Sequence, residues 1–220
     1  MAKRGNRILS TEEFRKLFDR RERAVLDRLE TPRLIQDFLD LTEYSSDPVY
    51  RSPRSVMRDK KAHCVDGALF AAAALRYHGR PPVVMELSAV RDDDHFLTLF
   101  EESGFLGCVA KSNFVGLRYR EPIHRSCREL ALSYFELYYN LAGEKTLRGY
   151  SRAVNLGVFD WTSWAVEDAL IEAQVVEAVA GARHFRLLTP AQEAGLSPMD
   201  RRAYEAGLLG ANADGLYKVS

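Results

Sequence analysis

The chain has 220 residues, which is enough for one sizeable hydrophobic core. Hydrophobic residues make up 46% of it and charged residues 28%, and 31 basic residues balance 31 acidic ones. A net charge of zero gives no global attraction to nucleic acid or to an anionic membrane. The longest apolar run, 68–75, is too short to cross a bilayer. The basic residues 1–7 are followed by no apolar stretch, so we expect no secretion signal.

The N-terminal part of the sequence predicts helices. Ser10 precedes a turn with two glutamates, which is an N-cap pattern, and apolar residues then recur at helical spacing as far as Leu29. A second helix is expected over 33–41 and a loop over 44–53. Ser52 and the proline that follows it predict a further short helix.

The strongest helix prediction runs from Cys64 to His78. This stretch is rich in alanine, which has the highest helix propensity, and it carries little charge on any side. We therefore expect a helix that is buried all round. Gly79 is the expected C-terminal stop, and the prolines at 81 and 82 prevent continuation.

Beyond this helix the pattern changes to the alternation typical of strands. We expect strands at 83–90, 95–101 and 105–112, a fourth strand candidate at 114–119, and helices at 127–141, at 161–179 and after Pro198. The sequence contains no internal repeat and no linker. It predicts one domain over 1–220, with a core at about 33–142 and a helical extension at about 143–220.

The three cysteines are an odd and sparse set without CxxC spacing, which predicts free thiols and a cytoplasmic protein. Cys64 is distinguished by its place in the first turn of a helix. Unpaired backbone N–H groups and the helix dipole stabilise a thiolate there, and the thiolate is the nucleophilic form. The alternative is a small apolar residue at a buried helix start. We expect Cys108 and Cys127 to be packing residues.

His95 opens the second predicted strand, where it is either a base for Cys64 or a hydrogen-bonded core histidine. A base of this kind is oriented through its other ring nitrogen. A tight turn at 102–104 brings His95 opposite 110–112. Asn113 is the only amide or acid close to that stretch, so we expect it to hold the imidazole. The acids 92–94 are expected to be solvated.

These features together resemble the transglutaminase-like superfamily, which has a papain-like cysteine fold, and in particular its small bacterial-type members. The resemblance covers about 44–120. It is carried by Cys64, by the acid Asp66, by the Ala/Leu-rich helix with its Gly and Pro stop, by Asp94-His95-Phe96 and by Gly104-Phe105. It implies an α+β fold in which a Cys-bearing helix packs on an antiparallel β-sheet, with helical extensions at the N- and C-terminal sides.

The chain departs from the family pattern at one position. Members usually carry an Asp about four residues after the aromatic that opens the third strand, and this chain has Val109 there. The resemblance therefore implies either that Asn113 takes over the orienting role or that the triad is incomplete. The backbone N–H of Cys64 is available to stabilise an oxyanion, and Tyr44 and Gln36 are further candidates.

Two groups of polar residues also allow another interpretation, as a metal site or as an anion site. His63, Cys64, Asp66 and His95 resemble a metal site in composition, but they lack the paired spacing of structural zinc sites, so we expect no metal. The arginines around 118–128 are a candidate site for an acidic group or phosphate, although pairing with nearby glutamates is the commoner use of such residues.

The sequence thus predicts a cysteine-dependent acyl-transfer enzyme that acts on an amide or peptide bond. Cys64 attacks the carbonyl, His95 is the base and Asn113 holds the imidazole. Hydrolysis is favoured over transfer because water needs no second binding site. We expect a peptide, protein or small amide as substrate, no cofactor, and neither nucleic acid nor membrane as partner; the sequence does not indicate the oligomeric state. The alternative is a catalytically inactive binding module with the same fold.

Overall fold

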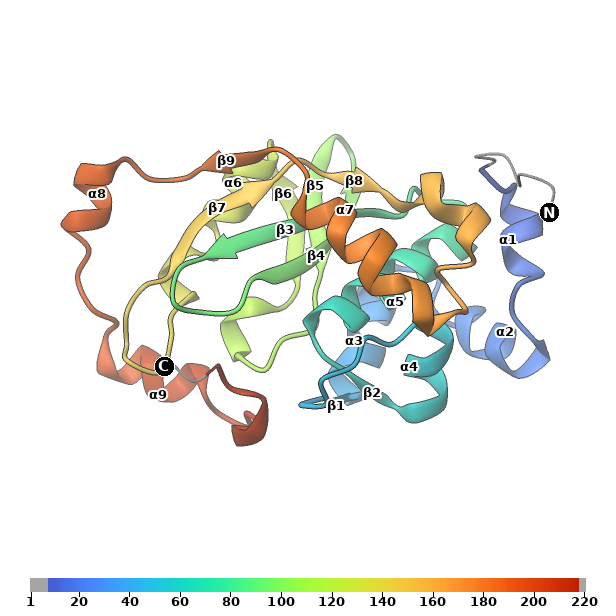
Figure 1. Ribbon diagram of the computed structural model, residues 1–220, viewed down its shortest axis with the longest axis horizontal. Helices are drawn as coiled ribbons and strands as arrows, with labels where there is room; N and C mark the ends of the chain where they lie inside the picture. Colours follow the sequence, from blue (N-terminus) through green and yellow to red (C-terminus); the bar gives the residue numbers. More distant parts are fainter. Residues whose placement is uncertain (1–7, 218–220) are drawn as a thin grey trace.

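The computed structural model describes residues 8–217, with only the backbone of Trp161 and Leu170. The basic stretch 1–7 lies outside the described residues. A β-sheet and a group of helices lie side by side, and the helical group includes α3, α4 and α5 (Figure 1). The predicted α+β class, with a Cys-bearing helix packed on an antiparallel sheet, is confirmed.

Most helices begin where the sequence places a capping side chain. Ser10, Thr31 and Ser52 each accept a backbone N–H of the turn that follows. Asp19 does the same, and it divides the helix expected over 11–29 into two. The described helices are α1 (Thr11–Arg15), α2 (Arg20–Leu26), α3 (Pro32–Leu41), α4 (Pro53–Asp59), α5 (Cys64–Tyr77), α6 (Cys127–Leu132), α7 (Glu177–Ala180), α8 (Pro190–Ala194) and α9 (Arg201–Gly207).

Helix α5 is the centre of the helical group. The side chains from Val65 to Leu75 are all buried, so the prediction of an all-round buried helix is confirmed. The helix ends before Gly79, whose φ of +81° is a left-handed conformation that favours glycine. The hydroxyl of Thr98 donates a hydrogen bond to the carbonyl of Ala68 and thereby ties the helix to the sheet.

One seven-stranded antiparallel sheet forms the other part, in the order β6-β5-β4-β3-β7-β9, with β8 also pairing with β3. Its strands are β3 (Val83–Ala89), β4 (His95–Glu102), β5 (Phe105–Val109), β6 (Arg120–His124), β7 (Leu147–Ser151), β8 (Val154–Asn155) and β9 (His184–Arg186). In the register of β3 and β4, His95 lies opposite Leu87. A separate parallel pair joins β1 (Glu43–Tyr44) to β2 (Lys61–Ala62).

Alternate residues of β4 point to opposite sides of the sheet. Phe96 and Phe100 pack in the cluster that contains α5. Leu97 and Leu99 pack in a second cluster on the other side, together with buried tyrosines including Tyr134. The sheet therefore separates two hydrophobic cores. Within residues 8–217, no helix is both long and apolar enough to span a membrane.

Three predicted elements are wrong. The helix expected over 127–141 ends at Leu132, and a 3₁₀ turn, Phe135–Leu137, follows it. The stretch 114–119 is not a strand: it contains a 3₁₀ turn, Val115–Leu117, and the next strand begins only at Arg120. The chain leaves the sheet after Val109 because the side-chain amide of Gln36 takes both backbone groups of Ala110, accepting from its N–H at 3.1 Å and donating to its carbonyl at 3.1 Å.

The third error concerns the extension at 143–220, which was expected to be helical. It contributes β7, β8 and β9 to the central sheet. The helix expected over 161–179 is divided into short pieces, namely the 3₁₀ turns Leu156–Thr162 and Asp168–Leu170, the π-helical turn Ile171–Val176 and α7. Short alternating runs such as 147–151 carry too few residues to be separated from helix by periodicity alone.

Candidate active site

The start of α5 is fixed by a capping box made of His63 and Asp66. The ring Nδ1 of His63 accepts the backbone N–H of Val65 at 3.1 Å, and the Asp66 carboxylate accepts the N–H of His63 at 3.2 Å. Burial lowers the pKa of His63 to about 4, so the ring is neutral and its Nδ1 remains an acceptor. The N–H of Cys64 is outside this cap and points to no acceptor within the helix.

The thiol of Cys64 lies at the beginning of β4. Its Sγ donates to the carbonyl oxygen of Asp94 at 3.8 Å and accepts the backbone N–H of Phe96. Burial raises the pKa of the thiol to about 12, and the Asp93 carboxylate acts in the same direction. The N–H of Phe96 opposes both, with a smaller effect. The expectation that the helix start yields a thiolate is therefore wrong: the resting form is the thiol.

His95 is the first residue of β4, and only 5% of its surface is exposed. Its Nε2 lies 2.8 Å from the carbonyl oxygen of Leu117. A carbonyl only accepts, so Nε2 carries the proton and Nδ1 keeps a free lone pair. Burial lowers the pKa of His95 to about 4, against the effect of the Leu117 carbonyl. The ring packs edge-on against Tyr134 and Tyr138, with centroids 6.4 Å apart in each case.

Cys64 and His95 line the same small cavity, of about 40 Å³. Cys64 packs with the α5 side of the sheet, and the His95 ring packs against tyrosines of the other side. Although both residues are described, no hydrogen bond joins the thiol to the imidazole, because the thiol bonds to Asp94 instead. The structure thus brings the two predicted residues to one cavity without pairing them.

Asn113 lies in the same cavity wall, but its amide is used elsewhere. Its Nδ2 donates to the carbonyl of Asn212 at 2.8 Å, and its Oδ1 accepts the N–H of Asn212 at 2.7 Å. The expected hydrogen bond between Asn113 and His95 is absent from the described residues, and the carbonyl of Leu117 takes its place. The reason is the 3₁₀ turn after β5, which brings the carbonyl of Leu117 within hydrogen-bond distance of Nε2.

The two candidates for an oxyanion contact are placed differently. Gln36 is buried and both ends of its amide are engaged by Ala110, so it does not reach the cavity. Tyr44 lines the cavity beside Cys64, and burial raises the pKa of its phenol well above the ordinary value. Tyr44 therefore remains a neutral hydrogen-bond donor at the site.

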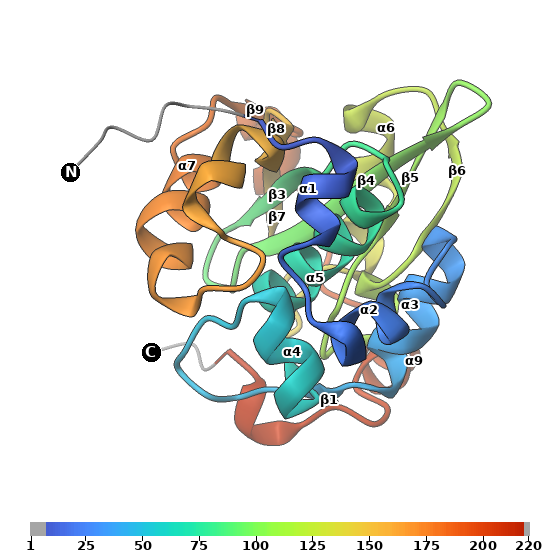
Figure 2. The ribbon, with the colours of Figure 1, turned by 90° about the vertical axis from the view of Figure 1, so that its right-hand side faces the viewer.

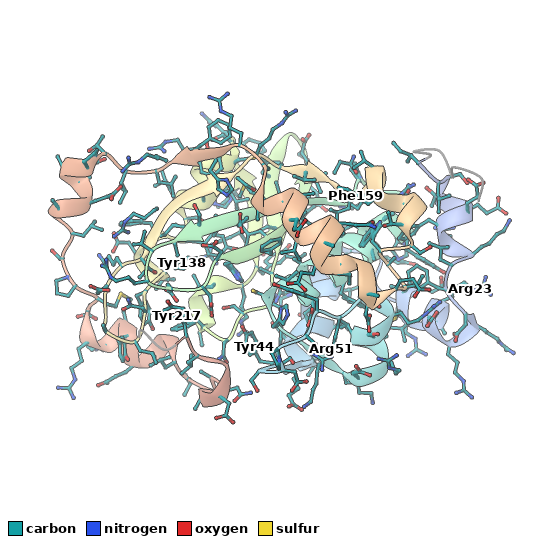
Figure 3. All side chains as sticks on the ribbon, in the orientation of Figure 1. Arg23, Tyr44, Arg51, Tyr138, Phe159 and Tyr217 are labelled. Carbon is teal, nitrogen blue, oxygen red and sulfur yellow. The ribbon has the colours of Figure 1, made fainter. Side chains whose placement is uncertain are left out.

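Sequence reasoning missed several residues that form the cavity. Tyr138 holds the turn before His95, since its hydroxyl donates to the carbonyl of Asp93 at 2.6 Å. Gly215 and Tyr217 close the cavity from the far end of the chain. Tyr44, Tyr138 and Tyr217 are labelled in Figure 3, which draws every described side chain. No local pattern in the sequence reveals these contacts.

A larger cleft of about 1010 Å³ shares Tyr44, Cys64 and Tyr217 with the small cavity. Its wall has no Lys or Arg among the described residues and is lined by carboxylates: Asp47, Glu86, Asp93, Asp94, Asp168, Glu172 and Asp214. Asp47 is paired with Arg51, and the Glu86 carboxylate lies 2.8 Å from Nε2 of His184. The other carboxylates leave the wall negative at the position where a ligand would approach the thiol.

The other polar groups considered in the sequence are engaged within the chain. Arg118 pairs with Asp40 at 2.9 Å, and Arg120 lies over the ring of Tyr134 at 3.8 Å. Cys108 is buried against the Tyr134 hydroxyl at 3.0 Å. The described residues contain no group of three or more His, Cys, Asp or Glu side chains that is suited to a metal ion.

Neither the protein-family models nor the curated proteins contain a match to this chain. Among solved structures, LapG from Legionella pneumophila is similar at 17% identity, over 48% of this chain and 71% of LapG, with a TM-score of 0.34. A likeness at this level carries no argument about function, so the assignment of the site rests on its own geometry.

Proposed function

We propose that the protein is a cysteine-dependent acyl-transfer enzyme of the transglutaminase-like kind, which acts on an amide or peptide bond. The observation that carries this proposal is the hydrogen bond from His95 Nε2 to the Leu117 carbonyl, at 2.8 Å. It leaves Nδ1 as a base in a cavity that Cys64 also lines. A base whose tautomer is fixed beside a thiol is the core of a Cys–His site.

The proposed reaction begins from a neutral pair, because the pKa of the thiol is high and that of the imidazole is low. Cys64 Sγ forms a bond to the carbonyl carbon while its proton passes to Nδ1 of His95. The oxyanion is held by the backbone N–H of Cys64, with the Tyr44 hydroxyl as a second donor. Collapse breaks the C–N bond, and the imidazolium protonates the departing amine.

The acyl group is then removed by water, which His95 deprotonates in the same way. Hydrolysis is preferred here to transfer because water needs no second binding site. A backbone carbonyl stabilises an imidazolium less than the carboxylate of a full triad does, so we expect slow turnover. The proposed Asn113 role in catalysis requires its amide to leave Asn212.

The acidic cleft indicates which substrates fit. A cleft wall with an excess of carboxylates and no Lys or Arg of its own favours a peptide or protein segment that carries positive charge. The reaction needs no cofactor. A cytoplasmic location, and the absence of a nucleic-acid or membrane partner, belong to the same proposal.

A second candidate is a binding module that keeps the cleft and performs no chemistry. The observation that favours it is the hydrogen bond of the thiol, which goes to Asp94 at 3.8 Å and not to His95. The raised pKa of Cys64 favours it too. In that case the cleft would bind a cationic peptide without cleaving it.

An acyl-trapping experiment separates the two. The protein is incubated with a p-nitrophenyl ester of a Lys-containing peptide, and the adduct is located by mass spectrometry. The enzyme proposal expects an acyl group on Cys64 that water removes over time, and no adduct in Cys64→Ala. His95→Ala should lower the rate by about 10²–10⁴-fold, whereas Cys127→Ala, at a half-buried thiol, serves as the control. Acylation of Cys64 at the same rate in the wild type and in His95→Ala would favour the binding module.

A further inference from the structure

The segment 212–217 lies across the candidate active site. Gly215 and Tyr217 line the small cavity with Cys64 and His95, and Asp214 joins them in the wall of the larger cleft. In Figure 2 the chain beyond α9 runs along the lower edge of the molecule, past β1 toward the C-terminus. A cavity of about 40 Å³ beside the thiol has room for water but not for a peptide.

The hydrogen bonds that hold this segment in place are made with backbone groups. The Asn113 amide bonds to both backbone groups of Asn212, at 2.8 and 2.7 Å. The Asn212 side chain in turn donates to the backbone carbonyl of Tyr44 at 3.2 Å. An amide that pairs with the N–H and C=O of one residue accepts any polypeptide with that backbone geometry. Asn113 is therefore suited to hold an incoming peptide as well as residue 212.

Close packing at Gly215 sets the depth of the segment in the cleft. A Cβ added there would lie 2.9 Å from Tyr44 Cε1 and 3.0 Å from Cδ1, which is too close for van der Waals contact. The backbone thus passes directly against the Tyr44 ring. A larger side chain at 215 cannot dock without moving the segment or the ring.

Several features of the segment favour its detachment from the cleft. Among residues 212–217 none is fully buried, and the turn before it contains Gly210 at a φ of +72°. Helix α9 stays anchored, because Tyr139 donates to the carbonyl of Tyr204 at 2.8 Å. Asp214 places a further negative charge in a cleft already lined by carboxylates, which weakens the docked state. Few buried contacts and this repulsion make local opening easy.

We infer that segment 212–217 is an autoinhibitory strap, which occupies the site as a peptide would and is displaced by a cationic polypeptide. This inference rests on the proposed function for its meaning in catalysis. The statement that the strap controls access to Cys64 does not depend on whether the protein turns over a substrate. Displacement also releases Asn113 for a new backbone partner.

The test measures access to the thiol in the full chain. Alkylation of Cys64 by iodoacetamide is followed at pH 8 by peptide mass spectrometry, which separates Cys64 from Cys108 and Cys127. Gly215→Val should raise the rate about tenfold, equivalent to about 1.4 kcal/mol. Ala213→Val is the matched control, because Ala213 belongs to the strap but is exposed, and it should leave the rate unchanged.

Two further measurements complete the design. Asn212→Ala removes the bond to Tyr44 without adding bulk, and it should also accelerate alkylation. A synthetic peptide with the sequence of residues 211–220, added to Gly215→Val, should restore protection, while a scrambled peptide should not. Equal alkylation rates in wild type, Gly215→Val and Asn212→Ala, all folded by circular dichroism, would overturn the strap. Faster alkylation without any acyl turnover would instead retain the strap and reject the enzyme.

Discussion

The thiol of Cys64 donates its hydrogen bond to the carbonyl oxygen of Asp94, at 3.8 Å, and not to the ring of His95. The position at a helix start favours a thiolate, but burial and the carboxylate of Asp93 outweigh it. The resting site therefore contains a thiol and a neutral imidazole, and the protein differs in this respect from an enzyme with a preformed ion pair.

This protonation state predicts the pH dependence of alkylation. With the pKa of Cys64 raised to about 12, the thiolate fraction grows throughout the accessible range. The rate at Cys64 should rise about tenfold per pH unit from roughly pH 7 to 10. Iodoacetamide kinetics with mass-spectrometric readout measure it. A plateau that begins below pH 7 would show a stabilised thiolate and contradict the assignment.

The low pKa of His95 predicts the pH at which activity falls on the acid side. The ring is a free base down to pH about 4 because burial disfavours its charged form. The value of kcat/KM for an acylating ester should therefore stay constant through pH 6 and fall only near pH 4. A limb at the ordinary histidine value of about 6.5 would mean that the site opens to water before it reacts.

The burial of Asp66 predicts that the free energy of unfolding depends on pH. This carboxyl is fully buried, and burial raises its pKa to about 7 from 3.8. Its stabilising contribution is complete below pH 3.8 and is lost as pH rises to about 7, because the unfolded chain releases the proton first. Relative to Asp66→Asn, the free energy of unfolding should fall by about 1.4 kcal/mol per pH unit in that window. Urea titrations at several pH values measure the difference, and parallel curves would contradict it.

Gly67 predicts a sensitive contact between α5 and the chain after β5. A Cβ at this position would lie 2.2 Å from Lys111 Cβ, which cannot move without its backbone. Gly67→Ala should lower the free energy of unfolding by about 1–3 kcal/mol. Gly195→Ala is the matched control, since its nearest atom would be 3.6 Å away. Thermal melts of both variants provide the comparison, and equal melting temperatures would refute the close contact.

The acidic cleft predicts a preference for charge. Glu172 lies in its wall, whereas Glu177 is exposed nearby on α7 and is not part of it. Glu172→Lys should lower kcat/KM for a Lys-containing peptide ester several-fold at low salt, and Glu177→Lys should not. The difference should shrink as salt rises, because the Debye length falls to about 3 Å at 1 M. A salt-independent loss would indicate a packing effect.

The sequence was sufficient for the elements that position Cys64 and His95. Alanine-rich composition and Gly79 predicted α5 from its first residue to within one residue of its end, and alternation predicted β3, β4 and the turn to β5. These signals are local: propensity, period and turn residues act over a few positions. The same signals placed both residues at the starts of adjacent elements, where they line one cavity.

The remainder of the site depends on contacts that no local signal encodes. The partner of His95 is a backbone carbonyl, which every residue possesses, so Leu117 could not be distinguished in advance. Asn113 was singled out as a polar residue near His95, but its amide is hydrogen-bonded to the backbone of Asn212, which is 99 residues away in the sequence. The electrostatic balance at Cys64 likewise depends on burial, which the helix position alone does not determine.

The position of β7 in the sheet has a consequence for how the chain can fold and be divided. Strand β3 lies between β4, which follows it directly, and β7, which begins only at Leu147. During synthesis, the helix with Cys64 and the β3–β4 hairpin emerge well before the strand that covers the second edge of β3. Until then that edge is open to pairing with another chain. A fragment that ends near residue 142, although it contains Cys64, His95 and Asn113, should therefore aggregate and not fold into a smaller active unit.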